Sequence, residues 1–205
     1  NNKKNLLINF NMPVYIMKLS KIFKFKFIHL STDCIFNGKI GNYKENSFPN
    51  ATDNYGLIKA KVENILKKSN SVIILRTSTI GHEISLKQGL LEWFLSSKGY
   101  VNGFTEAYFT GPTALELGKI IYRQILVKKS LKKGLFNVSS HKISKFLLLN
   151  KLKKMYKKKI KLVPDNKLKI DRSLSSEKFI NFTNYKVKSW NQMIYEMKKF
   201  NDEYI

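Results

Sequence analysis

The chain has 205 residues, of which 43% are apolar and 13% aromatic, enough to bury the core of one or two compact units. Its net charge is +24, but only three of the 38 basic residues are arginines and the lysines are spread along the chain, so we expect a solvated basic surface and no nucleic-acid partner. No apolar run reaches the roughly 20 residues that cross a bilayer. We therefore expect no membrane partner. A single cysteine leaves no internal disulfide, which favours a cytoplasmic location.

The first part of the chain predicts a strand–helix–strand unit. Its apolar pattern predicts a helix over 6–23, a buried strand over 25–30, a long loop over 31–53, a helix over 55–68 and a short buried strand over 72–75. Pro13 should either kink the first helix or open its second part. Two neighbouring parallel strands follow from this order. The loop then leaves the carboxyl end of a strand, where ligands bind in open α/β sheets.

The second part of the chain contains shorter and more mixed elements. We expect helices over 86–95, 113–127, 144–156 and 190–200, and strands over 135–138 and 160–163. Such a mixture is typical of a substrate-binding cap. We therefore predict an α/β protein, with the C-terminal part of a Rossmann-like doubly wound parallel sheet over 1–80. Residues 81–205 should form mainly a small mixed α/β cap, with some segments returning to the first domain.

A tyrosine and a lysine one helical turn apart are the strongest chemical signal. Tyr55 and Lys59 lie at i and i+4, so they point the same way on a helix, and a nearby ammonium stabilises a phenolate. We therefore expect Lys59 to lower the pKa of Tyr55 towards neutrality, which suits a general acid. Alone, such a pair is usually an ordinary exposed pair. Thr32, at the end of the preceding strand, adds a hydroxyl that can hydrogen-bond the same carbonyl oxygen. Hydroxyl, phenol and ammonium together indicate proton delivery during hydride reduction.

Several motifs resemble the extended short-chain dehydrogenase/reductases of the dTDP-4-dehydrorhamnose reductase type. The matching segments are STDCIFNG at 31–38, GNY at 41–43, ATD at 51–53, YGLIK at 55–59, LRTS at 75–78, IGHE at 80–83, GLLEWF at 89–94, KIDRS at 169–173 and SW at 189–190. They span almost the whole chain. The resemblance implies a reductase that uses NADPH or NADH and acts on a nucleotide-linked sugar.

The resemblance also implies roles for single residues. Thr32 matches the catalytic hydroxyl, Tyr55 the proton donor, and Lys59 the residue that holds the nicotinamide ribose and tunes the tyrosine. Ser31 neighbours Thr32 and could share its role at the cofactor. Asp33 is expected to contact the substrate together with Thr32.

Two further segments are expected at the ligands. Arg76, Thr77 and Ser78 stand at the end of the next strand, where the family approaches nicotinamide and substrate. Arg172 matches a basic position of the cap, where a guanidinium can fork onto a diphosphate. A salt bridge from Arg172 to Asp171 or another acid of the cap is an equally good interpretation.

The chain departs from the family pattern in three respects. No Gly-x-x-Gly-x-x-Gly turn occurs, which puts cofactor binding by this chain alone in doubt. The first residue is Asn1 rather than methionine, so we expect a fragment or a processed product lacking the start of the dinucleotide-binding domain. Cys34 stands where related reductases often have an aromatic residue. With one cysteine and scattered histidines, we expect no metal site.

The most consistent hypothesis is NAD(P)H-dependent reduction of a 4-keto nucleotide-linked deoxysugar in surface polysaccharide biosynthesis, by a possible homodimer. A sugar-nucleotide epimerase or dehydratase of the same superfamily is the first alternative. Dehydratases usually need an acidic pair beside the hydroxyl, whereas here only Asp33 is adjacent. A non-catalytic regulatory relative is the second alternative, although it has no need of Thr32, Tyr55 and Lys59 together.

Overall fold

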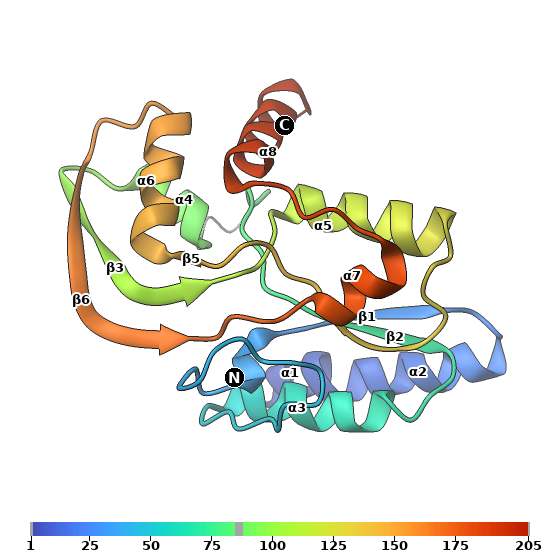
Figure 1. Cartoon of the computed structure of the whole chain (residues 1–205). Helices are drawn as coiled ribbons and strands as arrows, with labels where there is room; N and C mark the ends of the chain where they lie inside the picture. The colour runs from blue at the N-terminus through green and yellow to red at the C-terminus, as the bar shows by residue number, and fades with distance from the viewer. Residues whose placement is uncertain (1, 85–87, 205) are drawn as a thin grey trace.

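The computed structural model describes residues 2–84 and 88–204, which form helices and strands in alternation (Figure 1). The helical elements are α1 (Asn2–Leu6), η1 (Leu7–Asn11), α2 (Met12–Ile22), η2 (Asp33–Ile35), α3 (Asn54–Leu66), α4 (Leu90–Ser96), α5 (Ala114–Ile120), η3 (Ile121–Val127), α6 (Lys145–Met155), α7 (Glu177–Thr183) and α8 (Trp190–Tyr204). The strands are β1 (Phe27–Ser31), β2 (Val72–Arg76), β3 (Tyr100–Phe109), β4 (Gly134–Asn137), β5 (Ile143–Ser144) and β6 (Lys161–Asp171). None of the helices described here is long and apolar enough to cross a membrane.

A parallel sheet of order β1-β2-β4 forms the first half of the molecule. β1 pairs with β2 from Phe27 opposite Val72 to Ser31 opposite Arg76, and β2 pairs with β4 from Ile73 opposite Gly134. The predicted pair of neighbouring parallel strands joined by the helix of Tyr55 is therefore confirmed. β4 comes from the second half of the chain, so residues 134–137 lie in the same sheet as β1 and β2.

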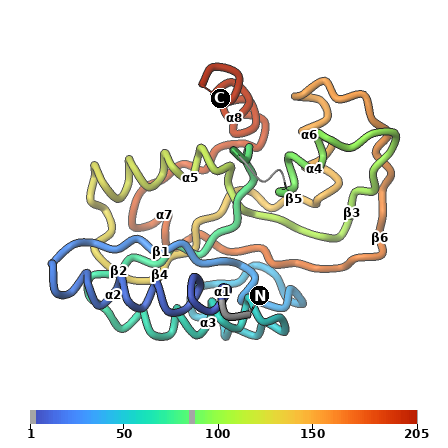
Figure 2. Tube along the Cα trace, turned by 180° about the vertical axis from the view of Figure 1, so that it is seen from behind, coloured from blue at the N-terminus to red at the C-terminus, as the bar shows by residue number. Residues whose placement is uncertain are grey.

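Helices cover both faces of this sheet, and β2 shows how its residues are divided between them. Val72 and Ile74 belong to the core cluster under α2 and α3, while Ile73 and Leu75 belong to the cluster under α5 and α7. This alternation is the period-two geometry of a strand buried on both faces. Figures 1 and 2 show α2 and α3 together on one side and α5 with α7 on the other.

The N-terminal helices run on continuously through Pro13. The π-helical turn η1 directly precedes α2, and the backbone N–H of Met12 bonds to the carbonyl of Leu7. A proline removes one helical N–H and its ring crowds the carbonyl four residues earlier, so a widened turn before it accommodates both effects. Pro13 therefore opens the second part of the helix, which is one of the two outcomes that the sequence predicted.

A second sheet of order β5-β3-β6 curves away from the first. β3 pairs parallel with β6 from Tyr100 opposite Lys161 to Tyr108 opposite Asp171, and antiparallel with β5. The sequence did not predict β3 or α7, and β6 is longer than the expected strand over 160–163. Polar residues and glycine interrupt the apolar pattern of β3, so its strand structure depends on partners far away in the chain. The start of the helix expected over 86–95 lies partly outside the described residues.

These two sheets confirm the predicted α/β class with a Rossmann-like parallel sheet. A core built from α4, α6, α8 and β3 packs against the second sheet, with Leu91, Phe94, Leu148, Leu152 and Ile194 almost fully buried. The division into domains at residue 80 stays a prediction. What matters for function is that the carboxyl ends of β1 and β2 face the second sheet across a cleft.

Candidate active site

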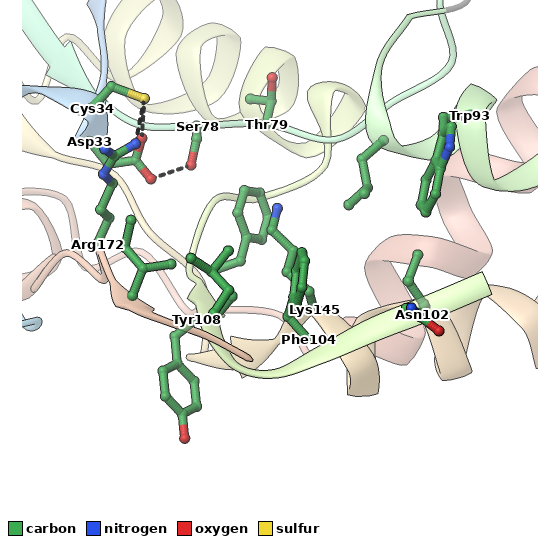
Figure 3. A pocket seen from close by; sticks show the side chains of 16 residues that line it. Asp33, Cys34, Ser78, Thr79, Trp93, Asn102, Phe104, Tyr108, Lys145 and Arg172 are labelled. Carbon is green, nitrogen blue, oxygen red and sulfur yellow. Dashed lines mark hydrogen bonds between the residues drawn. The ribbon is translucent and has the colours of Figure 1, made fainter. Parts of the chain in front are cut away.

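A cleft of about 580 Å³ opens where β1 and β2 end. One end is polar and the other is apolar and aromatic (Figure 3). The polar end holds Asp33, Cys34, Ser78 and Arg172. The remaining lining residues are Thr79, Leu90, Trp93, Asn102, Phe104, Ala107, Tyr108, Phe109, Lys145, Leu149, Leu168 and Ile170. A ligand with a charged part and an aromatic part fits such a cleft.

The backbone around Thr32 places its hydroxyl at the end of β1. Thr32 is extended, and its Oγ1 accepts a hydrogen bond from the backbone N–H of Cys34 (3.1 Å), which caps η2. The same hydroxyl donates to Oδ1 of Asp33 (3.3 Å). Thr32 therefore lies directly beside two residues of the cleft wall.

The start of α3 is held against this turn. Asp53 caps the helix, with its Oδ1 accepting from the N–H of Gly56 (2.8 Å). A Cβ atom at Gly56 would clash with the carbonyl oxygen of Cys34, so only glycine allows the helix to come this close. This close approach brings Tyr55, in the first turn of α3, to Thr32.

Tyr55 is 40% exposed and has an environment that keeps its phenol protonated. Burial raises the pKa of Tyr55, and the Cys34 thiol adds to this effect. A hydrogen bond with Thr32 has the opposite effect and lowers the pKa of Tyr55. The carboxylates of Asp33 and Asp53 raise this pKa further. The expected lowering of this pKa by Lys59 is therefore wrong, because the Lys59 ammonium is engaged at β1 and burial dominates at the phenol. At neutral pH the phenol carries its proton, as a proton donor must.

Lys59 is only 6% exposed and its ammonium faces β1. Nζ donates to the carbonyl of Leu30 (2.8 Å) and lies 3.3 Å from Nε2 of His29. Burial lowers the pKa of Lys59, which the Glu63 carboxylate partly offsets. Burial and then the Lys59 charge lower the pKa of His29 to about 3, so this imidazole is neutral. The structure thus brings Thr32 and Tyr55 together, whereas the Lys59 ammonium is engaged by the backbone of β1.

Four further residues were predicted to approach the cofactor, and the structure buries three of their side chains away from the cleft. Ser31 donates to Glu63 (2.5 Å), and Arg76 binds the same carboxylate, so both take part in a buried network. Thr77 is buried and its hydroxyl donates to the carbonyl of Ser78 (3.1 Å). Of these four side chains, only that of Ser78 lines the cleft. Direct contact of the other three with a cofactor stays a prediction.

Arg172 closes the polar end of the cleft. Its Nη1 donates to Sγ of Cys34 (3.4 Å), and its Nη2 lies 3.9 Å from Oδ2 of Asp53. Asp171, the alternative partner considered from sequence, pairs with Lys142 instead (2.5 Å). Opposite the guanidinium, Ser78 donates to Oδ2 of Asp33 (2.9 Å). The side chains of Asp33 and Arg172, both predicted at the substrate, therefore do face one cleft.

Sequence reasoning missed the residues of the far wall. Trp93 comes from α4, Lys145 from the start of α6, and the aromatic residues Phe104, Tyr108 and Phe109 from β3. Lys145 is one of many lysines, so nothing local distinguishes it. Only the pairing of β3 with β5 and β6 places these side chains opposite the end of β1.

No cluster of histidine, cysteine, aspartate or glutamate side chains within residues 2–84 and 88–204 could hold a metal ion. Cys34 adds no nucleophile, because burial raises the pKa of its thiol, although a hydrogen bond with Thr32 opposes this.

A known protein family matches the first part of the chain. Residues 1–94, which contain Thr32, Tyr55 and Lys59, match the family described as RmlD substrate binding domain. The predicted resemblance is thereby confirmed. Curated protein sequences yield no match.

Solved reductases of this kind share the fold along nearly the whole chain. A hypothetical dTDP-4-dehydrorhamnose reductase from Sulfolobus tokodaii is 24% identical, with a TM-score of 0.74 over 93% of this chain and 71% of that one. A dTDP-4-dehydrorhamnose reductase from Bacillus anthracis, solved with NADP, is 17% identical, with a TM-score of 0.80 over 96% of this chain and 74% of that one. A dTDP-glucose 4,6-dehydratase from Bacillus anthracis, solved with NAD, is 16% identical, with a TM-score of 0.75 over 95% and 68%. At these identities the likeness shows the fold alone.

Proposed function

We propose that this chain carries the catalytic and substrate-binding part of an NAD(P)H-dependent reductase of a 4-keto nucleotide-linked deoxysugar. The observation that carries the proposal is the proximity of the Tyr55 phenol to the Thr32 hydroxyl, beside a cleft that is polar at one end and aromatic at the other. The reductases of similar fold support it. Surface polysaccharide biosynthesis in the cytoplasm is the setting that such a substrate implies.

The described residues fit one end of a nicotinamide cofactor. The Lys59 ammonium has three N–H donors, of which Leu30 and His29 engage two, and the third could hold a ribose hydroxyl. No glycine-rich strand–turn–helix for the pyrophosphate occurs among the residues described here. When bound, the cofactor would supply a hydride to the carbonyl carbon.

The chain's own residues would handle the carbonyl oxygen. Tyr55 holds its proton at neutral pH and can release it to the oxygen as negative charge develops there. Thr32, whose hydroxyl now donates to Asp33, can turn that donor onto the same oxygen. Asp33 is itself kept in place by Ser78. Two donors converging on one oxygen stabilise an alkoxide-like transition state better than the neutral ketone.

The geometry favours reduction over the dehydratase or epimerase alternative. A dehydratase of the usual kind needs an acidic pair beside the hydroxyl, but the neighbour of Asp33 is Cys34, whose thiol is protonated because its pKa is raised. A regulatory relative would have no need to hold Tyr55 against Thr32.

A homodimer is also proposed, because α2 exposes apolar side chains such as Met12, Tyr15 and Ile22. Sedimentation velocity of wild type and Tyr15→Lys tests it.

Reduction is tested by joining the chain to a glycine-rich dinucleotide-binding segment from an NADP-binding reductase. We expect loss of NADPH absorbance that depends on dTDP-4-dehydrorhamnose. Tyr55→Phe should lower kcat by a factor of about 10²–10⁴, the usual contribution of a general acid. Tyr195→Phe, at an exposed tyrosine of α8 away from the cleft, is the matched control and should leave kcat unchanged. A fusion that binds both ligands yet transfers no hydride would refute the proposal.

A further inference from the structure

Lys145 is a cation in the wall of the cleft that the reductase chemistry does not use. It is the first residue of α6, whose N-cap Ser144 accepts a hydrogen bond from the N–H of Leu147 (3.2 Å). The ammonium lies 4.5 Å from the centre of the Phe109 ring. The side chain is half-buried and lines the cleft with Arg172. Its position is therefore set by a capped helix and an aromatic ring.

No carboxylate within residues 2–84 and 88–204 lies at ion-pair distance from the Lys145 ammonium. Burial lowers the pKa of Lys145, and the charge of Asp33 only partly opposes this. Moving a cation out of water without a counter-charge costs free energy. Binding of an anionic ligand beside the ammonium would offset that cost. Lys142, three residues earlier, does have a carboxylate partner in Asp171.

Arg172 offers a second set of free donors in the same cleft. Its Nε is buried without a hydrogen-bond partner, and its contacts to Cys34 and Asp53 are long. Neither contact saturates the guanidinium. Two cations with unused donors in one cleft match the several oxygens of a diphosphate.

Trp93 and Asn102 lie at the other end of the cleft. Figure 3 shows Lys145 between the Asp33–Arg172 group and these two residues. Trp93 is 43% exposed although it lines the cleft, and an accessible indole of this kind can serve as a stacking platform for a base. The asparagine amide can both donate to and accept from a base edge.

On the basis of the proposed function, we propose that Lys145 binds the diphosphate of the nucleotide sugar at the middle of the cleft, while Trp93 stacks on the base. The keto sugar then lies at the polar end, beside Thr32 and Tyr55. This orientation assigns one part of the ligand to each part of the wall. It also explains why the unpaired ammonium stands between the two ends.

The test is titration of the whole chain with thymidine diphosphate and with thymidine, followed by tryptophan fluorescence and calorimetry. Trp190 is buried and its indole N–H donates to the carbonyl of His141 (2.7 Å), so Trp93 should carry the change in fluorescence. We expect the diphosphate to bind more tightly than the nucleoside. Lys145→Met should weaken thymidine diphosphate binding by about tenfold or more, as loss of a charged hydrogen bond does, and should leave thymidine unchanged.

Two variants guard against misfolding and non-specific charge effects. Lys145→Arg keeps the charge and should retain the diphosphate preference. Lys151→Met is the matched control on the same helix, because its ammonium bonds to Asn191 outside the cleft (2.8 Å). Trp93→Leu should weaken the binding of thymidine diphosphate and of thymidine by the same factor, because both ligands carry the base.

Unchanged thymidine diphosphate affinity in Lys145→Met would overturn this inference and leave the reductase proposal standing. The same holds if Lys151→Met weakens binding as much as Lys145→Met does. If the wild type binds neither thymidine diphosphate nor thymidine, both proposals are overturned. Binding of the diphosphate without reduction in the fusion enzyme would overturn the reductase alone.

Discussion

Arg76 and Glu63 form a buried ion pair that fastens β2 to α3. Nη2 lies 2.7 Å from Oε2, and each side chain is 3% exposed. Ser31, at the end of β1, donates to the same carboxylate, and the guanidinium lies over the Phe36 ring at 5.3 Å. One carboxylate thus ties the helix that carries Tyr55 to the carboxyl ends of two strands.

Replacing Glu63 should therefore be costly. Glu63→Gln leaves the Arg76 guanidinium buried without its counter-charge, and we expect a loss of about 3–5 kcal/mol in the free energy of unfolding. Urea denaturation measures this loss. Asp202→Asn is the matched control, because Asp202 is 53% exposed and pairs with Lys198 one turn away on the surface of α8, and it should cost less than about 1 kcal/mol. Equal losses in the two variants would contradict the buried network.

The neutral imidazole of His29 should make stability depend on pH. Its pKa is about 3 in the folded chain against 6.5 for a free histidine, so between these values the unfolded chain binds more protons. Stability contributed by His29 is therefore complete above about pH 6.5 and is lost as the pH falls towards 3. At about pH 5 we expect a loss of about 2 kcal/mol relative to neutral pH.

His29→Gln tests this expectation, because an amide oxygen can still accept from Lys59. The variant should show a flatter decline of unfolding free energy between neutral and mildly acidic pH, measured by urea titrations at each pH. His141→Gln, at an exposed position, is the matched control. An unchanged slope in His29→Gln would show that other groups cause the decline.

The 205-residue chain by itself should bind NADPH only weakly. Its sequence has no glycine-rich phosphate-binding turn, and β1 pairs on one edge alone among the described strands. Isothermal calorimetry should show no saturable heat at micromolar NADPH, whereas the fusion with a dinucleotide-binding segment should bind one equivalent. Tight stoichiometric binding by the chain alone would refute this prediction.

The positive charge should produce only weak and unselective DNA binding. A protein of net charge +24 releases counterions from DNA at low salt, so some association is expected there. At about 0.15 M salt, where charges are screened beyond about 8 Å, binding should vanish for every sequence. Fluorescence anisotropy with two unrelated duplexes measures this. Sequence-selective affinity surviving at that salt would make nucleic-acid binding the better function.

Local sequence patterns were sufficient for the first half of the fold. β2 is apolar at every position but its last and is buried on both faces, so its strand structure and its parallel partner could be predicted. The N-cap Asp53 and the stripe of apolar residues along α3 likewise define that helix locally. β3 could not be predicted, because its alternation is interrupted and its partners lie as far away as Lys161–Asp171.

By itself the sequence determined the strand–loop–helix–strand order and the placement of Thr32 and Tyr55 at one sheet edge, because both follow from short-range periodicity and chain reversal. Only the tertiary structure decided that Lys59 turns its ammonium to the backbone of β1, that Arg76 is engaged by Glu63, and that the far wall presents Trp93 and Lys145. These outcomes depend on which side chains meet across long stretches of chain. Burial and the competition for hydrogen-bond partners settle them, and neither can be read from neighbouring residues.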